Sequence, residues 1–221
     1  MSLRIAIALL VLSLSASAYA QDHGATVGGS VAAVNMDSQT DLAFTGTFGY
    51  RFTRVFGMEI DVTAAPDLHS PFGDDFLRVL SGGTIIQSFP GPSLNDAGGR
   101  QVIFTNNARI EIPTTAARLT PYFVAGGGIA STRRSGTLIY FAPAPTTIVG
   151  VPPVPIGTVA REIRYPVSSS STDLALTLGG GVGVRVVSRM SVDVDLRVIR
   201  LMGGEQDRNV GRFGVGVRYR F

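Results

Sequence analysis

The sequence predicts an all-β fold, an eight-stranded antiparallel up-and-down transmembrane β-barrel, and three observations support this. Apolar and polar residues alternate along most of the chain, as in strands with two different faces. Charged residues make up only 16% of the chain, whereas roughly 25% is usual in a soluble domain. Yet no apolar run after residue 20 reaches the length of about 20 residues that a membrane-spanning helix needs. A membrane barrel reconciles these observations, because apolar residues occupy every second position of its strands.

The strand pattern recurs in eight segments, and it is clearest between Leu42 and Phe52. A membrane band about 25 Å tall, crossed at about 40°, needs roughly ten residues per strand, and most of the segments are that long. Residues 119–131 are rich in glycine, so the pattern does not assign their faces. The eight segments are 25–34, 42–52, 56–63, 101–112, 119–131, 174–186, 192–198 and 212–221.

Short and long connections alternate between these segments. The short connections are Thr53–Arg54, 113–118 and Ser188–Arg189, and the others are 35–40, 65–100, 132–171 and 201–209. Outer-membrane barrels have short periplasmic turns and longer external loops. We therefore expect the short turns on the periplasmic side, and 65–100 and 132–171 as two long extracellular loops.

Within the second long connection, residues 142–158 contain five prolines, which should prevent a regular ladder there. Flanking residues Thr137–Phe141 and Val159–Val167 either extend their strands beyond the membrane or belong to a disordered loop.

Residues 1–20 have the features of a secretory signal peptide. Arg4 precedes a short apolar stretch from Ile5 to Leu14, and Ala18-Tyr19-Ala20 is a small-x-small cleavage site. We expect cleavage after Ala20, export of the chain, and a mature barrel domain of residues 21–221.

Alternation alone does not decide which face of the barrel points outward. The polar faces carry acids and arginines in similar numbers, which would pair inside a narrow lumen. The apolar faces carry aromatic residues near strand ends, as in an interfacial girdle. We therefore expect apolar side chains to face lipid and charged side chains to face the lumen. The girdle candidates are Tyr50, Phe52, Phe56, Tyr219 and Phe221.

The closing segment RFGVGVRYRF, which ends on Phe221, resembles the C-terminal signal of bacterial outer-membrane proteins. Residues 121–128 (PYFVAGGG) and 178–183 (LGGGVG) resemble strand patterns of small eight-stranded outer-membrane barrels, the group of outer-membrane proteins A and X and the opacity proteins. The resemblance implies an outer-membrane location in a Gram-negative cell envelope. It also implies recognition of Tyr219 and Phe221 by the barrel-assembly machinery. It does not specify an activity.

An eight-stranded barrel has an interior just wide enough for side chains. Charged residues of the polar faces should therefore form a network of ion pairs that plugs the lumen, the alternative being an ion pathway. The expected network consists of Arg51, Glu59, Asp61, Arg109, Glu111, Arg185, Asp193, Asp195, Arg197 and Arg218. Arg212 lies on the same polar face.

Composition excludes several kinds of chemistry. The chain has no cysteine, only two histidines, and a net charge of +3 that does not suggest a nucleic-acid partner. No spaced ligand motif accompanies the acids of 65–100, so we expect no metal and no cofactor. Some small barrels modify lipid A, and His69 with Ser70, Asp67, Asp74 and Asp75 nearby is the candidate for such chemistry. His23 is expected near the periplasm.

Four arginines near the rim of the second long connection offer a different function, since guanidinium groups bind phosphates through paired hydrogen bonds. Arg133, Arg134, Arg161 and Arg164 either contact lipopolysaccharide in this way or form an ordinary solvated rim.

The sequence thus favours a monomeric, non-enzymatic outer-membrane barrel with a structural or surface-interaction role through its external loops. The alternatives are a narrow porin-like channel and a lipid A-modifying enzyme.

Overall fold

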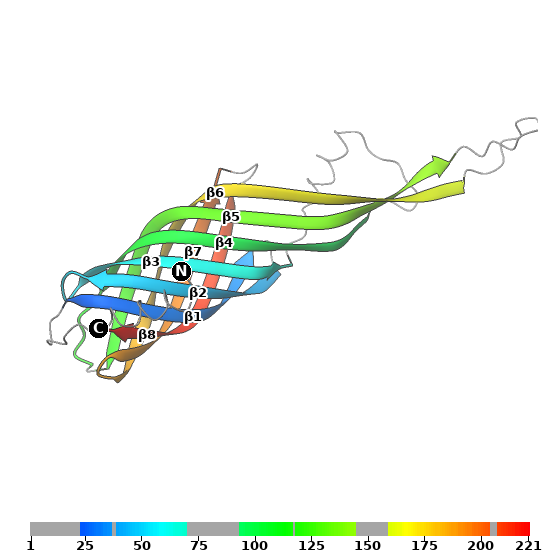
Figure 1. Cartoon of the computed structure of the whole chain (residues 1–221). Helices are drawn as coiled ribbons and strands as arrows, with labels where there is room; N and C mark the ends of the chain where they lie inside the picture. The colour runs from blue at the N-terminus through cyan, green and yellow to red at the C-terminus, as the bar shows by residue number, and fades with distance from the viewer. Residues whose placement is uncertain (1–22, 37–38, 70–92, 117, 145–158, 204–206) are drawn as a thin grey trace, which may run out of the picture.

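The computed structural model describes residues 23–36, 39–69, 93–116, 118–144, 159–203 and 207–221, and it consists of eight strands. Figure 1 shows them side by side around one barrel axis. The predicted all-β, eight-stranded antiparallel barrel is therefore confirmed. The strands are β1 (Gly24–Met36), β2 (Gln39–Arg51), β3 (Phe56–Leu68), β4 (Ser93–Glu111), β5 (Leu119–Ala144), β6 (Val159–Val187), β7 (Met190–Met202) and β8 (Arg208–Arg220).

Each strand pairs antiparallel with its neighbours in sequence, and β1 pairs with β8 to close the barrel. The closing ladder runs from Thr26 opposite Arg220 to Asn35 opposite Gly211. Closure leaves the membrane-length part of the sheet without a free edge, which a bilayer requires because lipid cannot hydrogen-bond to unpaired backbone groups. In the part of the chain that the structure describes, no helix is long and apolar enough to cross a membrane.

One end of the barrel carries the short connections. Residues 52–55 join β2 to β3, residues 112–118 join β4 to β5, and residues 188–189 join β6 to β7. The first turn is closed by the Phe52 and Thr53 amides, which both donate to the Phe56 carbonyl at 3.0 Å. The C-terminus lies at this same end (Figure 1). We call it the short-turn end, and the other end the long-connection end.

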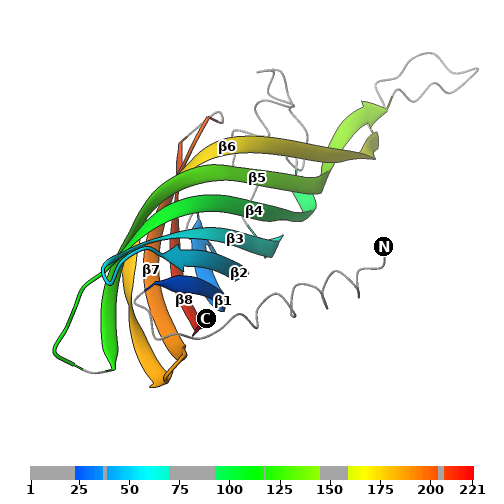
Figure 2. The same cartoon turned by 60° about the vertical axis from the view of Figure 1, so that its left-hand side comes forward.

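Strands β4, β5 and β6 continue past the rim at the long-connection end as a projecting sheet (Figures 1 and 2). The β5–β6 ladder is unbroken from Leu119 opposite Val184 to Ala144 opposite Val159. The alternative that Thr137–Phe141 and Val159–Val167 extend their strands is therefore confirmed, whereas the boundaries 132–171 given for the connection were too wide. Pro143 itself belongs to the ladder, opposite Ala160, because β4 ends at Ser93 opposite Ile139 and β5 is an edge strand beyond that point, where proline is tolerated. The other prolines of 142–158 lie outside the described residues.

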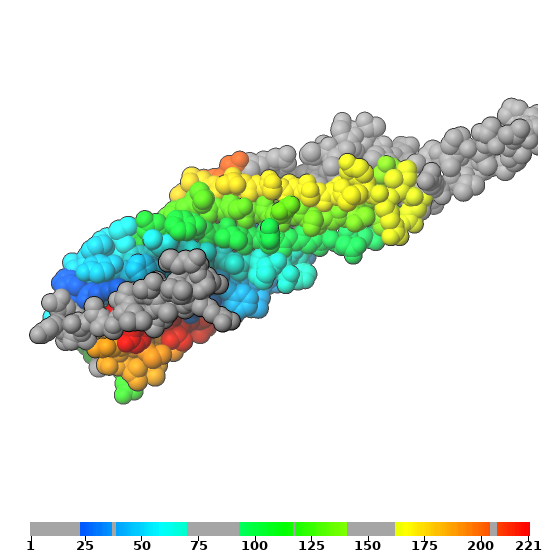
Figure 3. All heavy atoms as spheres, in the orientation of Figure 1, coloured from blue at the N-terminus to red at the C-terminus, as the bar shows by residue number. Residues whose placement is uncertain are grey.

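The two faces of the barrel wall differ in the expected sense over most of its height. Phe48 is 56% exposed and Leu178 67% exposed on the outer face, whereas Glu59 is 1% exposed on the inner face. Apolar side chains thus form a continuous outer belt across the strands. Figure 3 shows one side of the molecule, where the outer surfaces of neighbouring strands adjoin. Charged side chains are enclosed.

Candidate functional site

Glu59 is the centre of the charged lumen. Its carboxylate accepts hydrogen bonds from Arg197 Nη2 at 3.0 Å, Arg218 Nη2 at 3.1 Å and Arg109 Nη1 at 3.4 Å. These arginines come from β7, β8 and β4, while Glu59 belongs to β3. One buried carboxylate therefore connects four strands from around the barrel.

Asp61 lies next to Glu59 on the inner face of β3 and binds the other side of Arg197. Arg197 Nη1 donates to Asp61 at 2.5 Å, and Arg197 Nη2 lies 3.2 Å from Asp195. Asp61 also accepts from the Asn107 amide at 2.8 Å and the Thr47 hydroxyl at 2.5 Å. Both charges of the Arg197–Asp61 pair are therefore compensated although the side chains are buried, which is the condition for tolerating buried ions.

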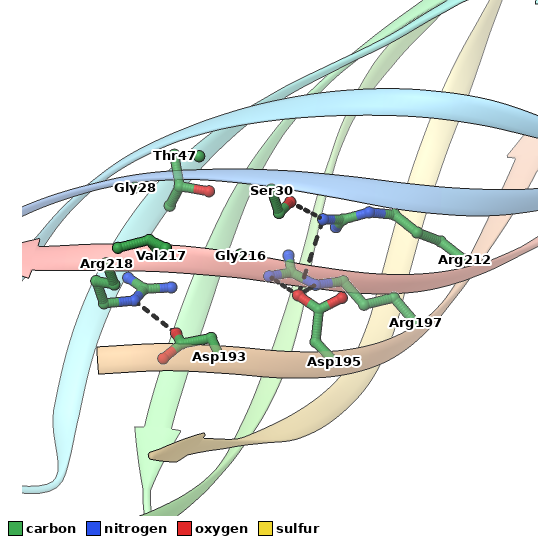
Figure 4. Close-up of a pocket in the computed structure, with 11 residues that line it drawn as sticks. Gly28, Ser30, Thr47, Asp193, Asp195, Arg197, Arg212, Gly216, Val217 and Arg218 are labelled. Carbon is green, nitrogen blue, oxygen red and sulfur yellow. Dashed lines mark hydrogen bonds and ion pairs between the residues drawn. The ribbon is translucent and has the colours of Figure 1, made fainter. Parts of the chain in front are cut away.

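Asp193 forms a second bridge between strands, on the side of the lumen formed by β7 and β8. It accepts from Arg218 Nε at 2.8 Å, Arg109 Nη2 at 3.4 Å and the Ser191 hydroxyl at 2.8 Å. Figure 4 shows Arg218 and Asp193 pointing toward each other from adjacent strands, with Asp195 and Arg197 beside them.

Closer to the short-turn end, Glu111 completes the network. It lies 2.9 Å from Arg51 and 3.2 Å from Arg109. Of the ten network residues predicted from the sequence, the structure brings together all except Arg185. That side chain is exposed at the short-turn end and makes no ion pair among the described residues. We call the enclosed residues the ionic tier.

Three further residues belong to the ionic tier. Arg212 lies 3.8 Å from Asp195 and donates to Ser30 at 2.9 Å, and its inward direction follows from the alternation of β8. The Arg109 guanidinium carbon lies 3.4 Å from the centre of the Tyr122 ring, a cation–π contact. Asn107 bridges Asp61 and Thr105. The alternation could not reveal Tyr122, because its segment has glycine on both faces.

Glycines of β6 make room for these large side chains. A Cβ at Gly181 would lie 2.7 Å from the Tyr122 hydroxyl, and one at Gly179 would lie 2.8 Å from Cγ of Arg197. The inward-facing glycines of 178–183 thus form a part of the inner wall without side chains, which leaves space for the large side chains of the lumen.

At the long-connection end the lumen has a different filling. Aliphatic side chains from all eight strands are buried together, and none of them carries a charge. We call this layer the apolar tier. It consists of Val34, Met36, Ala43, Ala65, Leu68, Ile103, Ala130, Ala175, Ile199, Leu201 and Val210. The sequence analysis expected ion pairs in the lumen and did not foresee this layer.

At the level of the apolar tier, the outer face also changes character. Polar residues begin to occupy outward positions that are apolar nearer the short turns, although Leu42, Val102 and Leu174 still face outward beside buried members of the tier. On β7, for example, Ile199 and Leu201 are 3% exposed while Arg200 between them is exposed. We call the exposed outer set the polar ring: Asn35, Thr40, Arg100, Arg133, Thr172, Arg200 and Asn209.

His69 pairs with a carboxylate on the rim that was not among the acids expected from its sequence neighbourhood. Its Nδ1 lies 2.7 Å from Oδ1 of Asp41, and its backbone amide donates to both oxygens of that carboxylate at 3.2 Å. Asp41 belongs to β2, and Asp67 is exposed without an ion pair to His69. Ser70, Asp74 and Asp75 lie outside the described residues. His23 is exposed at the short-turn end beside β1.

The four rim arginines do not form one cluster. Arg133 is exposed on the outer face of β5, whereas Arg134 points to the inner face. Arg164 is bound to Glu162 at 2.6 Å. Along β6, Arg164 lies six positions from Ser170, which is the residue opposite Arg133. At 3.3 Å per residue, Arg164 is therefore about 20 Å from Ser170 along the strand. The structure describes only the backbone of Arg161.

Aromatic rings gather at the short-turn end. The rings of Tyr50 and Phe52 lie 5.2 Å apart, those of Phe52 and Phe56 5.9 Å, and those of Tyr219 and Phe221 4.9 Å. These contacts form one triad of rings around the β2–β3 turn and one pair at the C-terminus, both at the same rim. Among the described residues, no group of three or more His, Cys, Asp or Glu residues could hold a metal ion.

The comparisons with known proteins identify the class. The family model described as the outer membrane protein beta-barrel domain matches residues 5–221, so the chain belongs to this family. No curated protein matches the chain. Among solved structures, it is similar to Neisserial surface protein A, with 14% identity, a TM-score of 0.51, and coverage of 91% of this chain and 98% of that one.

Two other solved barrels are similar at lower scores. The attachment invasion locus protein Ail of Yersinia pestis has 17% identity, a TM-score of 0.48, and coverage of 90% of this chain and 97% of that one. The outer membrane enzyme PagL has 10% identity, a TM-score of 0.43, and coverage of 89% and 99%. At such identities the likeness concerns the fold alone. The family model describes a barrel domain and does not fix the activity.

Proposed function

We propose that this chain is a non-conducting, non-enzymatic outer-membrane barrel with a structural or surface-interaction role at the cell surface. The observation that carries the proposal is the filled lumen, which is closed by the ionic tier and again by the apolar tier. An aqueous pathway would need a continuous polar passage, and the apolar tier interrupts it with aliphatic side chains from every strand.

The outer surface supports the placement in the membrane. Exposed apolar residues cover the outside of the barrel from the aromatic rim to the polar ring, and this is the pattern of a surface in contact with lipid. At the polar ring the outward residues change from apolar to polar, which suggests that the strands leave the lipid there and enter water. The short-turn end then faces the periplasm, and the projecting sheet of β4, β5 and β6 faces outward.

Because the chain has no cysteine, single cysteine variants can test this placement without background. Spin labels on Phe44→Cys, Ile60→Cys and Val194→Cys in the outer belt should be accessible to oxygen dissolved in lipid. A label on Thr40→Cys in the polar ring should be accessible to a water-soluble nickel chelate. Water accessibility at all four positions, with the protein folded, would reject the placement.

Conductance tests the closed lumen. The folded protein in planar bilayers should give no steady single-channel currents. Steady currents would favour the alternative, a narrow channel. One observation favours that alternative, since two cavities border the ionic tier. One is lined by Arg197, Arg212 and Asp195, and the other by Arg185, Arg220 and Glu111. A channel would therefore need the apolar tier to open and the ionic tier to rearrange.

The contact of His69 with Asp41 is the observation that favours an enzyme as the second alternative. A histidine held by a carboxylate resembles two members of a nucleophilic triad, but it also fixes the end of β3 to β2, and we propose this structural role. Purified protein should leave lipid A unmodified in both the wild type and His69→Ala. Turnover of lipid A that disappears in His69→Ala would establish the enzyme.

We further propose export with removal of residues 1–20, assembly through Tyr219 and Phe221, and a monomeric state. The mature protein from membranes should have the intact mass of a chain that begins at Gln21. Phe221→Ala should reduce the folded fraction in outer membranes, as measured by heat-modifiable migration on gels. Equal folded fractions in wild type and variant would contradict recognition of this residue by the barrel-assembly machinery.

A further inference from the structure

Two arginines stand directly opposite each other on the outer face of the barrel. Arg100 of β4 is the register partner of Arg133 of β5, and both side chains are exposed. Directly opposed residues of an antiparallel pair have Cβ atoms about 4.5–5.5 Å apart, and like charges in that position are destabilising. The register therefore places two arginine side chains directly next to each other on the wall, an arrangement that a counter-charge would stabilise.

Their height on the barrel is well defined by their neighbours. Val102 and Phe104 on β4 and Ile129 on β5 face outward on the same side, with 43%, 42% and 57% exposure. Arg100 is the next outward position after Val102, about 7 Å further along the strand. Both arginines thus stand where the apolar belt ends, at the height at which lipid headgroups meet water.

Neither arginine is neutralised by a residue that the structure describes. Among the described residues, Arg100 and Arg133 form no ion pair, and Asp67, an exposed acid on the β3 bulge, does not bind Arg100. Arg200 provides the contrast, since it lies in the same polar ring and is bound to Asp207 at 2.8 Å. The unpaired charge is therefore local to β4 and β5 and not a general property of the ring.

A third donor extends the row onto β6. Ser170 is the register partner of Arg133 and is exposed on the same face. Three adjacent strands thus present a guanidinium, a second guanidinium and a hydroxyl at one level. Planar guanidinium groups bind phosphate oxygens through pairs of charge-assisted hydrogen bonds, and a hydroxyl can add another. An anion between the arginines would also remove their mutual repulsion.

We propose that Arg100, Arg133 and Ser170 form a binding site for a phosphate monoester of an outer-leaflet glycolipid. The inference rests on the proposed membrane placement, which sets these side chains at headgroup height on the external side. It differs from a general lipopolysaccharide contact of the rim arginines, because Arg134 faces inward and Arg164 is bound to Glu162. A monoester suits the site better than a diester, since its greater charge can compensate two arginines.

The test compares lipid binding by the folded protein purified from membranes, measured by native mass spectrometry in detergent. The probes are lipid A with its phosphates, lipid A after removal of the phosphates, and phosphatidylglycerol. Arg100→Gln/Arg133→Gln should weaken binding of phosphorylated lipid A by about tenfold or more, and Ser170→Ala by about two- to threefold. Arg200→Gln, the matched control in the same ring, should stay within about twofold of wild type because its charge is already paired.

Dephosphorylated lipid A should bind equally weakly to wild type and to the double variant. Unchanged affinity in the double variant, or an equal loss in Arg200→Gln, would overturn the site. Equal affinity of wild type for phosphatidylglycerol would overturn the assignment to a monoester. Heat-modifiable migration of each variant separates these outcomes from a failure to fold, and the spin-label accessibilities described above test the membrane placement independently.

Discussion

The ionic tier and the apolar tier fill the same lumen by opposite means. In the ionic tier, charged side chains point inward and apolar side chains point outward. In the apolar tier, aliphatic side chains point inward, while outward residues such as Leu42 and Val102 are still apolar and give way to the polar ring only further along the strands. The filling of the lumen therefore changes from charged to apolar before the outer surface changes from apolar to polar.

The two tiers also differ in how they tolerate change. The ionic tier depends on matched charges with defined geometry, because each buried ion must keep its partners. The apolar tier depends on volume, since aliphatic groups have no directional requirement. Substitutions should therefore act through lost charge compensation in one tier and through cavities in the other, and the sizes of these effects distinguish the tiers.

The largest effect is expected at the centre of the ionic tier. Glu59→Gln leaves Arg109, Arg197 and Arg218 without their shared carboxylate, and it should lower the free energy of unfolding by about 3–5 kcal/mol. Guanidinium titrations of protein in lipid vesicles, followed by gel migration, measure this change. Glu162→Gln is the control, because it breaks an exposed ion pair worth about 0–1 kcal/mol. Similar losses in both variants would refute the enclosed character of the ionic tier.

A slightly smaller effect is expected in the apolar tier. Leu201 is 3% exposed, so Leu201→Ala removes a buried side chain and leaves a cavity, at a cost of about 2–5 kcal/mol. Leu196→Ala on the same strand should cost less, because Leu196 is 62% exposed and lipid chains can fill the space it leaves. The same titrations compare the two variants, and a larger loss at Leu196 would contradict a packed apolar tier.

A smaller effect is expected from substituting a glycine of the inner wall, where the absence of a side chain leaves space for the ionic tier. Gly181→Ala adds a Cβ that would lie 2.7 Å from the Tyr122 hydroxyl and would also collide with the Val194 carbonyl. Overpacking of this kind costs about 1–3 kcal/mol. Gly46→Ala is the matched control, since its Cβ would meet no atom within 4 Å. Equal stability of the two variants would show that β6 does not need its glycines for packing.

The smallest effect is expected between the tiers. The hydroxyls of Thr45 and Thr63 are hydrogen-bonded at 2.9 Å in a buried position. Thr45→Val leaves one buried hydroxyl without its partner and should cost about 1–3 kcal/mol, near the lower limit because threonine and valine have similar shapes. Thr45→Val/Thr63→Val should recover most of that loss. A double variant less stable than either single variant would show that this layer depends on its polar groups, as the ionic tier does.

Much of the architecture was predictable because alternation is a local property of the chain. Leu42 to Phe52 reads as a two-faced strand without knowledge of its neighbours, and the short turns at Thr53–Arg54 and Ser188–Arg189 set the antiparallel order. The strand ends were less predictable. The sequence placed a connection at 132–171 and left open whether its flanks extend the strands. In the structure, pairing continues to Ala144 opposite Val159, because β5 and β6 provide partners for each other far beyond the barrel rim.

The sequence by itself determined the eight strands, the closed barrel and the enclosure of most of the charged residues, since each follows from which residues alternate and how far apart the turns lie. Only the tertiary structure decided which charges meet. Glu59 and Arg218 are 159 positions apart and become neighbours through strand stagger and barrel closure. The same stagger sets Arg100 opposite Arg133 and gathers Leu68 and Val210 into the apolar tier, because register is a property of pairs of strands and not of any one segment.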